Sequence, residues 1–191
     1  MTDTTGVATF EDRLADRSTW RTGEACPIVK ALDIVGTRSA LLIIREAFYG
    51  TTRFDDFTAR IEITEAVAAA RLRDLTAAGL FVRVPYKEPG QRTRYEYRLT
   101  PMGRDLAPAI IGLYQWGGAH LSPGGKPPLA LTHDACGTGV SAALVCECGD
   151  PVEPGDIRII VSPREVRDHA PDLRKRRRNA TLEGMTGIEP A

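Results

Sequence analysis

The sequence lacks any apolar run long enough to cross a membrane. Its longest apolar run near the N-terminus covers residues 40–44, far below the roughly 20 residues that a spanning helix needs. Residues 1–13 contain neither the basic leader nor the apolar core of a secretion signal. We therefore expect a cytoplasmic protein.

Histidines are scarce, and the three that are present, His120, His133 and His169, are scattered. The sequence contains no nucleophile placed beside a base, no glycine loop of the kind that cradles phosphates, and no catalytic pair of carboxylates. These absences argue against an enzyme. We expect no catalytic residues and, apart from one zinc candidate described below, no cofactor.

Net charge is also absent, since 25 basic side chains balance 25 acidic ones. An even distribution would disfavour nucleic-acid binding, but residues 71–104 carry eight basic and three acidic side chains. Phosphate contacts depend on such a local excess rather than on the overall sum. The basic side chains are Arg71, Arg73, Arg83, Lys87, Arg92, Arg94, Arg98 and Arg104.

Residues 53–100 show two successive hydrophobic periods. Apolar residues recur at helical spacing as far as Leu75, and the spacing becomes strand-like at 80–84 and again at 95–99. This order predicts helix, turn, helix and two-stranded hairpin, which is a winged helix-turn-helix. The expected fold class is α+β, mainly α, and the expected partner is double-stranded DNA.

The second of these helices is the expected recognition helix. Thr64 is placed to cap it, and Gly79 is placed to end it after Ala78 in the left-handed conformation. The predicted DNA contacts lie at Arg53, on this helix and on the loop of the hairpin. They are Arg53, Thr64, Glu65, Ala66, Ala69, Ala70, Arg71, Arg73, Lys87, Gln91, Arg92 and Arg94.

Three further helices are expected around this motif. One begins at Cys26-Pro27, and a largely apolar one covers 38–48. The third is expected from Thr100 to Leu121, with a kink at Pro108. Its long apolar face, including Leu113 and Trp116, indicates a homodimer interface, or alternatively a cover for the protomer's own core. Within the motif itself, the first helix is expected to start at Thr52.

A series of short motifs occurs in order between residues 26 and 121. They are Cys26-Pro27, Gly36, Arg45-Glu46, Gly50-x-x-Arg53-Phe54, Ile63-Thr64, Leu72-Arg73-x-Leu75, Gly79-Leu80, Glu96-Tyr97-x-Leu99-Thr100, Gly103 and Trp116-Gly117. With these motifs, residues 26–121 resemble the HxlR family of bacterial winged-helix transcription regulators. The resemblance implies a homodimer on a roughly palindromic operator, often acting as a repressor, with the first-helix cysteine, here Cys26, as a thiol sensor in some members.

The sequence departs from the family pattern in two places. Ser39 stands where many members have tryptophan, so a small-molecule pocket beside the second helix would differ. Ala66, Ala69 and Ala70 stand where longer polar residues are common. Because alanine cannot hydrogen-bond to base edges, we expect this helix to read thymine methyl groups and DNA shape.

The rest of the chain is expected to consist of an N-terminal arm (1–25), a linker (122–128), a ribbon-like extension (129–163) and a basic tail (164–191). His133, Cys136, Cys146 and Cys148 have the residue types of a structural zinc site, although Cys146-x-Cys148 is one residue short of the usual spacing. A free or oxidised thiol pair is the alternative. Two other functions stay open beside the DNA-binding regulator: a thiol- or metal-dependent redox protein, and a winged helix that binds proteins.

Overall fold

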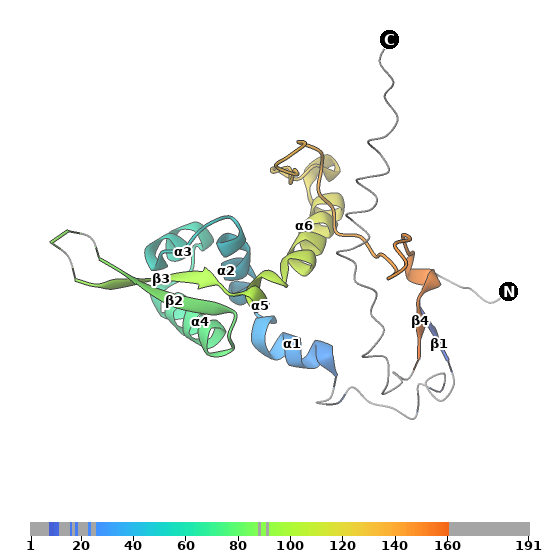
Figure 1. Ribbon diagram of the computed structural model, residues 1–191, viewed down its shortest axis with the longest axis horizontal. Coiled ribbons are helices and arrows are strands. Elements are labelled where there is room, and N and C mark those ends of the chain that lie inside the picture. Colours follow the sequence, from blue (N-terminus) through green and yellow to red (C-terminus); the bar gives the residue numbers. More distant parts are fainter. Residues whose placement is uncertain are drawn as a thin grey trace, which may run out of the picture. The chain divides into compact units, whose positions relative to one another are not determined.

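The computed structural model describes residues 8–11, 16, 18, 23, 26–87, 89–90 and 92–160. The chain divides into two compact units (Figure 1). Residues 21–142 form the first, which we call the winged-helix unit. Residues 1–20 and 143–191 form the second, which we call the terminal unit. Each unit is described by itself.

The winged-helix unit begins with two helices whose starts follow from local sequence. Pro27 opens α1 (Pro27–Val35), because a first-turn proline gives up no helical hydrogen bond. Thr37 caps α2 (Arg38–Phe48), accepting a hydrogen bond through Oγ1 from the amide of Ala40 at 3.2 Å. Both helices were predicted from the apolar spacing.

The helix-turn-helix consists of α3 (Phe54–Ile61) and α4 (Glu65–Ala77). The turn passes through Glu62, which has a left-handed backbone at φ 56°, and Thr64 caps α4 by accepting from the amide of Val67 at 3.3 Å. The predicted start of α3 at Thr52 is wrong. Thr52 instead donates its hydroxyl to Glu96 Oε2 at 3.3 Å, and α3 begins after Arg53.

The wing is an antiparallel pair of β2 (Phe81–Tyr86) and β3 (Arg94–Leu99), in a register that places Phe81 opposite Leu99 and Tyr86 opposite Arg94. The amide of Tyr97 donates to the carbonyl of Thr52 at 2.7 Å. This bond ties the wing to the residues that lead into α3, so the wing projects from the helix-turn-helix in a defined direction (Figure 1).

The core of the unit lies where α2, α3, α4 and the base of the wing meet. Phe57 and Phe81 meet edge to face, with ring centroids 6.4 Å apart and planes at 86°. Because α4 turns one face inward, its opposite face stays free for another partner. The buried apolar residues are Val35, Ala40, Ile43, Ile44, Phe57, Ile61, Ala68, Leu72, Leu75, Leu80 and Phe81.

The last helix differs from the prediction. Instead of one kinked helix, the chain forms a short α5 (Pro101–Arg104) and, after a break at residues 105–106, a separate α6 (Ala107–Leu121). Pro108 lies in the first turn of α6, where the missing amide proton and the fixed φ cost nothing. The chain therefore changes direction before the proline rather than bending at it.

Gly103 of α5 packs tightly against Leu80 and Leu99 at the base of the wing, and its replacement tests the packing there. A Cβ at this position would lie 2.3 Å from the carbonyl oxygen of Leu80 and 2.9 Å from Leu99 Cδ2. We expect Gly103→Ala to lower the free energy of unfolding by about 2 kcal/mol or more. Gly117→Ala is the matched control, because a Cβ at that helical position meets nothing within 4 Å.

The control should gain about 0.5–1 kcal/mol, since alanine is the better helix former. Urea titrations of both variants measure the two effects. Equal stabilities for the two variants would contradict the close approach at Gly103.

The terminal unit pairs a strand near the N-terminus with a strand from the second half of the chain. In it, β1 (Thr9–Phe10) lies parallel to β4 (Arg158–Ile159), and Glu11 Oε1 accepts from Arg158 Nη1 at 2.8 Å. A 3-10 turn, η4 (Pro154–Asp156), precedes β4. The predicted N-terminal arm thus contributes a strand, and the predicted basic tail, 164–191, lies outside the described residues.

The division between the units falls after Ala142. The predicted linker, which includes a 3-10 turn, η3 (Pro123–Gly125), and the first part of the predicted extension therefore belong to the winged-helix unit. Within the described residues, none of the helices has the length and apolar character needed to span a bilayer.

Candidate nucleic-acid interface

The outward face of α4 is open to a partner. Glu65, Ala66, Ala69 and Arg73 are exposed on it, while Ala70 and Arg71 are half-buried. Thr64, which caps the helix, is exposed as well. The face is open because Ala68, Leu72 and Leu75 turn the other side of α4 into the core. An exposed helix of this length is of the size that fits a DNA major groove.

The cations of α4 are held by one acidic residue. Arg71 Nη1 and Arg73 Nη2 both lie 3.4 Å from a carboxylate oxygen of Asp74. Exposed ion pairs of this kind contribute little to stability, so phosphates can take the place of Asp74. The side chain of Arg73 is 75% exposed, which makes it the more accessible of the two.

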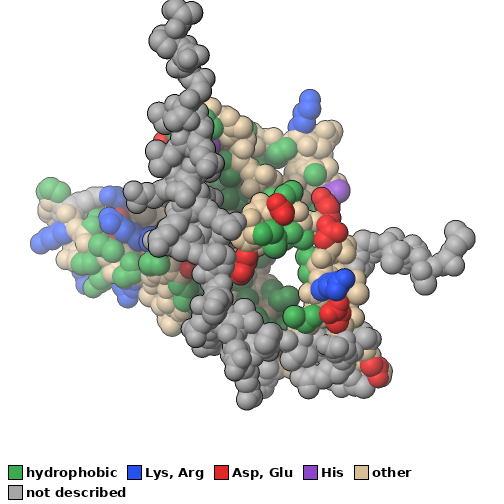
Figure 2. All heavy atoms as spheres, turned by 45° about the vertical axis from the view of Figure 1, so that its right-hand side comes forward, with side chains coloured by type: hydrophobic (Ala, Val, Ile, Leu, Met, Phe, Trp, Pro, Cys, Tyr) green, Lys and Arg blue, Asp and Glu red, His purple; other side chains and the backbone are tan. Residues whose placement is uncertain are grey.

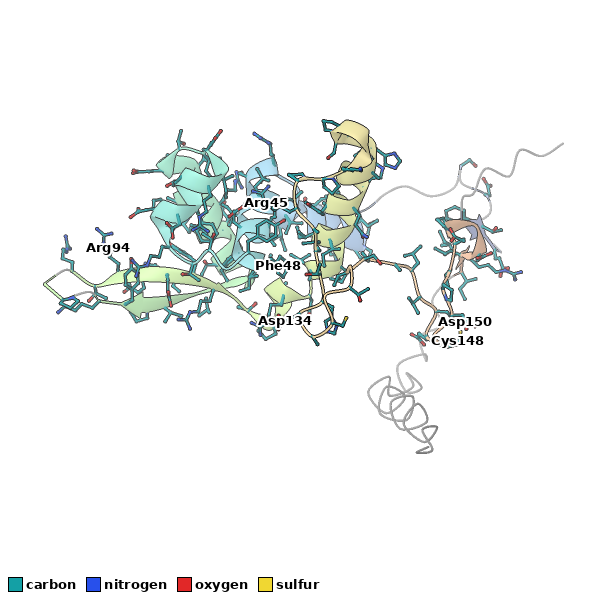
Figure 3. The ribbon with its side chains drawn as sticks, turned by 90° about the horizontal axis from the view of Figure 1, so that it is seen from above. Arg45, Phe48, Arg94, Asp134, Cys148 and Asp150 are labelled. Atoms are coloured by element: carbon teal, nitrogen blue, oxygen red, sulfur yellow. The ribbon has the colours of Figure 1, made fainter. Side chains whose placement is uncertain are left out.

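The wing carries a second group of cations. Lys87 and Arg92 are exposed, and Arg94 reaches back to Asp55 of α3, with 3.5 Å between Nη1 and Oδ2. Basic side chains gather at the wing end of this unit in Figure 2, and Figure 3 labels Arg94 there. Gln91, also predicted to contact DNA, lies outside the described residues.

Two arginines stack on tyrosines of the wing. The guanidinium of Arg53 lies 4.6 Å from the ring centroid of Tyr86, and that of Arg83 lies 4.0 Å from the ring of Tyr95. Stacking of this type orients a guanidinium without neutralising it. The predicted DNA contacts include Arg53 but not the two tyrosines, and Arg83 was named only as part of the basic stretch. The antiparallel pairing of the two strands could have indicated Arg83. It lies opposite Tyr97, and Tyr95, two residues along the same strand, is its diagonal neighbour.

Comparison with known proteins agrees with the helix-turn-helix and wing described above. The model of the HxlR-like helix-turn-helix family matches residues 34–124. The uncharacterized HTH-type transcriptional regulator Rv3095 of Mycobacterium tuberculosis is 44% identical over 124 residues, which cover 64% of this chain and 77% of that protein. The chain belongs to the HxlR-like family. Another relative, the uncharacterized HTH-type transcriptional regulator YdeP of Bacillus subtilis, is 33% identical over 95 residues, or 49% of this chain and 73% of the relative.

Solved structures agree. PA1607, described as a transcription factor, matches with a TM-score of 0.65 and 32% identity over 73% of this chain and 96% of its own. PA1374 of Pseudomonas aeruginosa, also described as a transcription factor, matches with a TM-score of 0.52 and 29% identity. The match covers 74% of this chain and 96% of that protein. HxlR-like proteins are DNA-binding transcription regulators, which are not enzymes. The predicted family, fold class and absence of enzymatic function are thereby confirmed.

Cys26 lies where the HxlR-like resemblance placed a sensor. It is the residue immediately before α1, it is half-buried, and its side chain makes no capping hydrogen bond. The position is the N-terminal end of α1, where the first backbone amides of the helix have no partner within the helix. The geometry is that of the predicted sensor, and sensing itself stays a prediction.

The four predicted zinc ligands divide between the two units. His133 and Cys136 lie together in the winged-helix unit, with Nδ1 and Sγ 3.2 Å apart, and Cys146 and Cys148 belong to the terminal unit. Among residues 26–87, 89–90, 92–160 and the other described positions, no three metal-binding side chains form a group. The four-ligand zinc set therefore stays a prediction.

Both cysteine turns contain a glycine with a left-handed backbone. Gly137 and Gly149 follow Cys136 and Cys148 with φ of 69° and 102°, a conformation that favours glycine. Hydrogen bonds from the Thr138 side chain and amide lower the pKa of the Cys136 thiol. These turns present sulfurs to solvent rather than to a core.

Proposed function

We propose that this HxlR-like regulator is a cytoplasmic, homodimeric, sequence-specific repressor that responds to a thiol-reactive or small-molecule signal. The observation that carries the proposal is the combination, in one unit, of an open recognition helix, a cationic wing and uncovered apolar helix faces. The first two are suited to duplex DNA. The third is suited to a second copy of the chain.

The dimer is supported by apolar side chains that the protomer leaves uncovered. On α6, Leu113 is 55% and Trp116 58% exposed, and on α1 both Ile28 and Leu32 are exposed. These helices lie at the end of the winged-helix unit away from the wing (Figure 1). Exposed apolar side chains grouped on a helix face are typical of an interface, and a two-fold dimer would present two recognition helices to two half-sites.

The chemistry of α4 indicates how bases would be read. Ala66, Ala69 and Ala70 can contact thymine methyl groups but can form no hydrogen bond through their side chains, whereas Glu65 can accept one from the amino group of cytosine. Arg71, Arg73 and the wing cations would contact phosphates. We infer a short operator with few positions read directly and a larger share read through DNA shape.

Selection from genomic DNA followed by footprinting tests this function. We expect enrichment of a site with two related halves, protected on both. No enrichment of any sequence at moderate salt would refute sequence-specific binding and would favour the protein-binding alternative. Protection of a single half-site would refute the dimer but not DNA binding.

Arg92→Ala is expected to weaken binding to all DNA sequences alike. Removal of one phosphate contact should reduce the slope of log affinity against log salt by about one unit. Fluorescence anisotropy with operator and with random DNA, between low and moderate salt, measures this. Lys126→Ala removes an exposed cation outside α4 and the wing and should leave the slope unchanged. A change in sequence preference in Arg92→Ala would instead assign this residue to base contact.

Cys26 is the proposed site of a thiol-reactive signal. Mild oxidant is expected to change operator affinity in the wild type and to have no effect in Cys26→Ser, because serine has no sulfur that the oxidant can modify. Anisotropy before and after oxidation, with reversal by a reductant, measures the response. An equal response in both proteins would move the sensor to Cys136, Cys146 or Cys148.

A further inference from the structure

The winged-helix unit contains an apolar cavity that the DNA interface does not use. It has a volume of about 460 Å³ and lies between the end of α2, the first half of α6 and the segment that follows the predicted linker. Figure 3 labels Phe48 on the α2 side of this region and Asp134 in the segment beyond. The lining residues are Phe48, Tyr49, Ala107, Ile110, Ile111, Tyr114, Ala130, Leu131, Thr132 and Val140.

The outer wall of the cavity is residues 129–142, which we call the cover hairpin. It doubles back on itself, with the amide of Val140 donating to the carbonyl of Leu131 at 2.8 Å. The hydroxyl of Tyr114 donates to the carbonyl of Leu129 at 2.5 Å and accepts from its amide at 3.2 Å. At the other end the amide of Ala142 donates to Gln115 Oε1 at 2.8 Å.

Because hydrogen bonds to α6 hold both ends of the cover hairpin, its middle does not need to collapse onto the helices. The space beneath it is therefore maintained by specific polar contacts at its edges. Its volume lies within the range of pockets that bind small molecules. These features describe a pocket that is partly open to solvent and whose outer wall is fixed to α6 at both ends.

The lining defines the chemistry of the occupant. The cavity has three aromatic rings, from Phe48, Tyr49 and Tyr114, and no lysine, arginine, aspartate or glutamate among its lining residues. A charged ligand would lose its hydration there without compensation. Hydroxyl groups come from Tyr49 and Thr132, while that of Tyr114 is engaged by Leu129. Partial burial raises the pKa of Tyr49, so this hydroxyl stays protonated and can donate.

We propose that this cavity binds a small, uncharged, aromatic molecule bearing one or two hydrogen-bonding groups, and that this molecule is the effector of the regulator. The binding stands on the cavity alone. The effector role rests on the proposed function, since it requires an operator whose affinity can change.

The position of the cavity connects two functional surfaces. Ile110, Ile111 and Tyr114 line it from one side of α6, while Leu113 and Trp116 remain exposed on a different side of the same helix. A ligand beneath the cover hairpin therefore supports the helix that carries the proposed dimer interface.

On the opposite wall, Phe48 and Tyr49 lead directly into the helix-turn-helix. Glu46, which is 7% exposed, accepts from the hydroxyl of Thr51 at 3.3 Å, and Thr51 accepts from Arg60 of α3 at 2.7 Å. A molecule that fills the cavity contacts α2 and α6 together. It can thereby change the angle between α6, which carries the proposed dimer interface, and the helix-turn-helix. That angle decides whether the two recognition helices of a dimer fit two half-sites.

N-phenyl-1-naphthylamine is a suitable probe, because it is uncharged, aromatic and fluoresces strongly only in apolar surroundings. Titration of the full chain should show saturable binding of about one probe per chain. Ala107→Phe and Ala130→Phe fill the cavity from the α6 side and from the cover hairpin, and each should weaken binding by at least about tenfold. Ala59→Phe, at an exposed position of α3, should bind as the wild type does.

Two results would overturn the binding site. One is an absence of saturable binding in the wild type, as expected if a second copy or another segment of the chain occupies the cavity. The other is equal binding in wild type and both filled variants, which would place the probe on the exposed faces of α1 and α6. Thermal unfolding shows whether each variant is folded. Because there are two cavity-filling variants, the test still works if one of them does not fold.

Operator affinity with and without the probe tests the effector role. A change in the wild type that is absent in Ala107→Phe supports it, and an unchanged affinity with the cavity occupied refutes it. A failure of the proposed function would give a different result. A chain that binds the probe but selects no DNA sequence would have the ligand site without being a sequence-specific repressor.

Discussion

Leu113→Asp is expected to convert the dimer into monomers and to lower operator affinity by about a hundredfold or more. A carboxylate at the centre of an apolar interface loses its hydration without a partner, and a monomer loses the advantage of engaging two half-sites at once. Light scattering coupled to gel filtration measures the mass, and anisotropy measures the affinity. The side chain is more than half exposed in the protomer, so the fold of each copy should tolerate the change.

Leu113→Met is the control for this variant, because it preserves an apolar side chain of similar volume and should remain dimeric. A dimeric Leu113→Asp protein would move the interface to α1, where Ile28 and Leu32 are exposed. A monomer that binds its operator with wild-type affinity would show that the dimer is not needed for recognition.

Ala69→Glu should abolish detectable operator binding, with a loss of about a hundredfold or more. Ala69 is exposed on the face of α4 assigned to the major groove, so a carboxylate there would meet acceptor groups of the bases and the phosphates on either side. The effect should be larger than that of Arg92→Ala, because it adds a repulsion instead of removing one contact among several.

Ala69→Gln separates charge from size in this test. It has the same length as the glutamate variant and can hydrogen-bond to adenine, so we expect weaker binding or an altered site rather than a complete loss. Anisotropy with operator DNA compares the two, and circular dichroism confirms that α4 is intact. Wild-type affinity in Ala69→Glu would place the DNA away from this face of α4.

Local signals were sufficient for the helices and caps of the DNA-binding motif. Thr64 caps α4 and Gly79 takes a left-handed backbone (φ 83°) after it, as expected, because capping depends on a few neighbouring residues. Thr52 has the same cap chemistry but was misassigned, since its hydroxyl bonds to Glu96 across the fold. A competing partner far along the chain cannot be read from a local pattern.

Features that depend on residues far apart in the sequence could not be predicted from local patterns. Pro108 was correctly recognised as incompatible with a helix interior, but the sequence did not indicate that the chain would break at residues 105–106 and use this proline in a new first turn. Gly103 fits only because α5 lies against Leu80 and Leu99. The stacking of Arg53 on Tyr86 likewise requires α3 and the wing to be placed together.

By itself the sequence determined the family, the order of the helices and strands, the cationic stretch at residues 71–104 and the alanines of the reading face, because periodicity, caps and charge are properties of short segments. Only the tertiary structure decided that residues 122–142 belong to the winged-helix unit, and that the cover hairpin lies over α6 with a cavity beneath it. The pocket depends on how the side chains of α2, α6 and this hairpin are spaced across the fold, which no local pattern specifies.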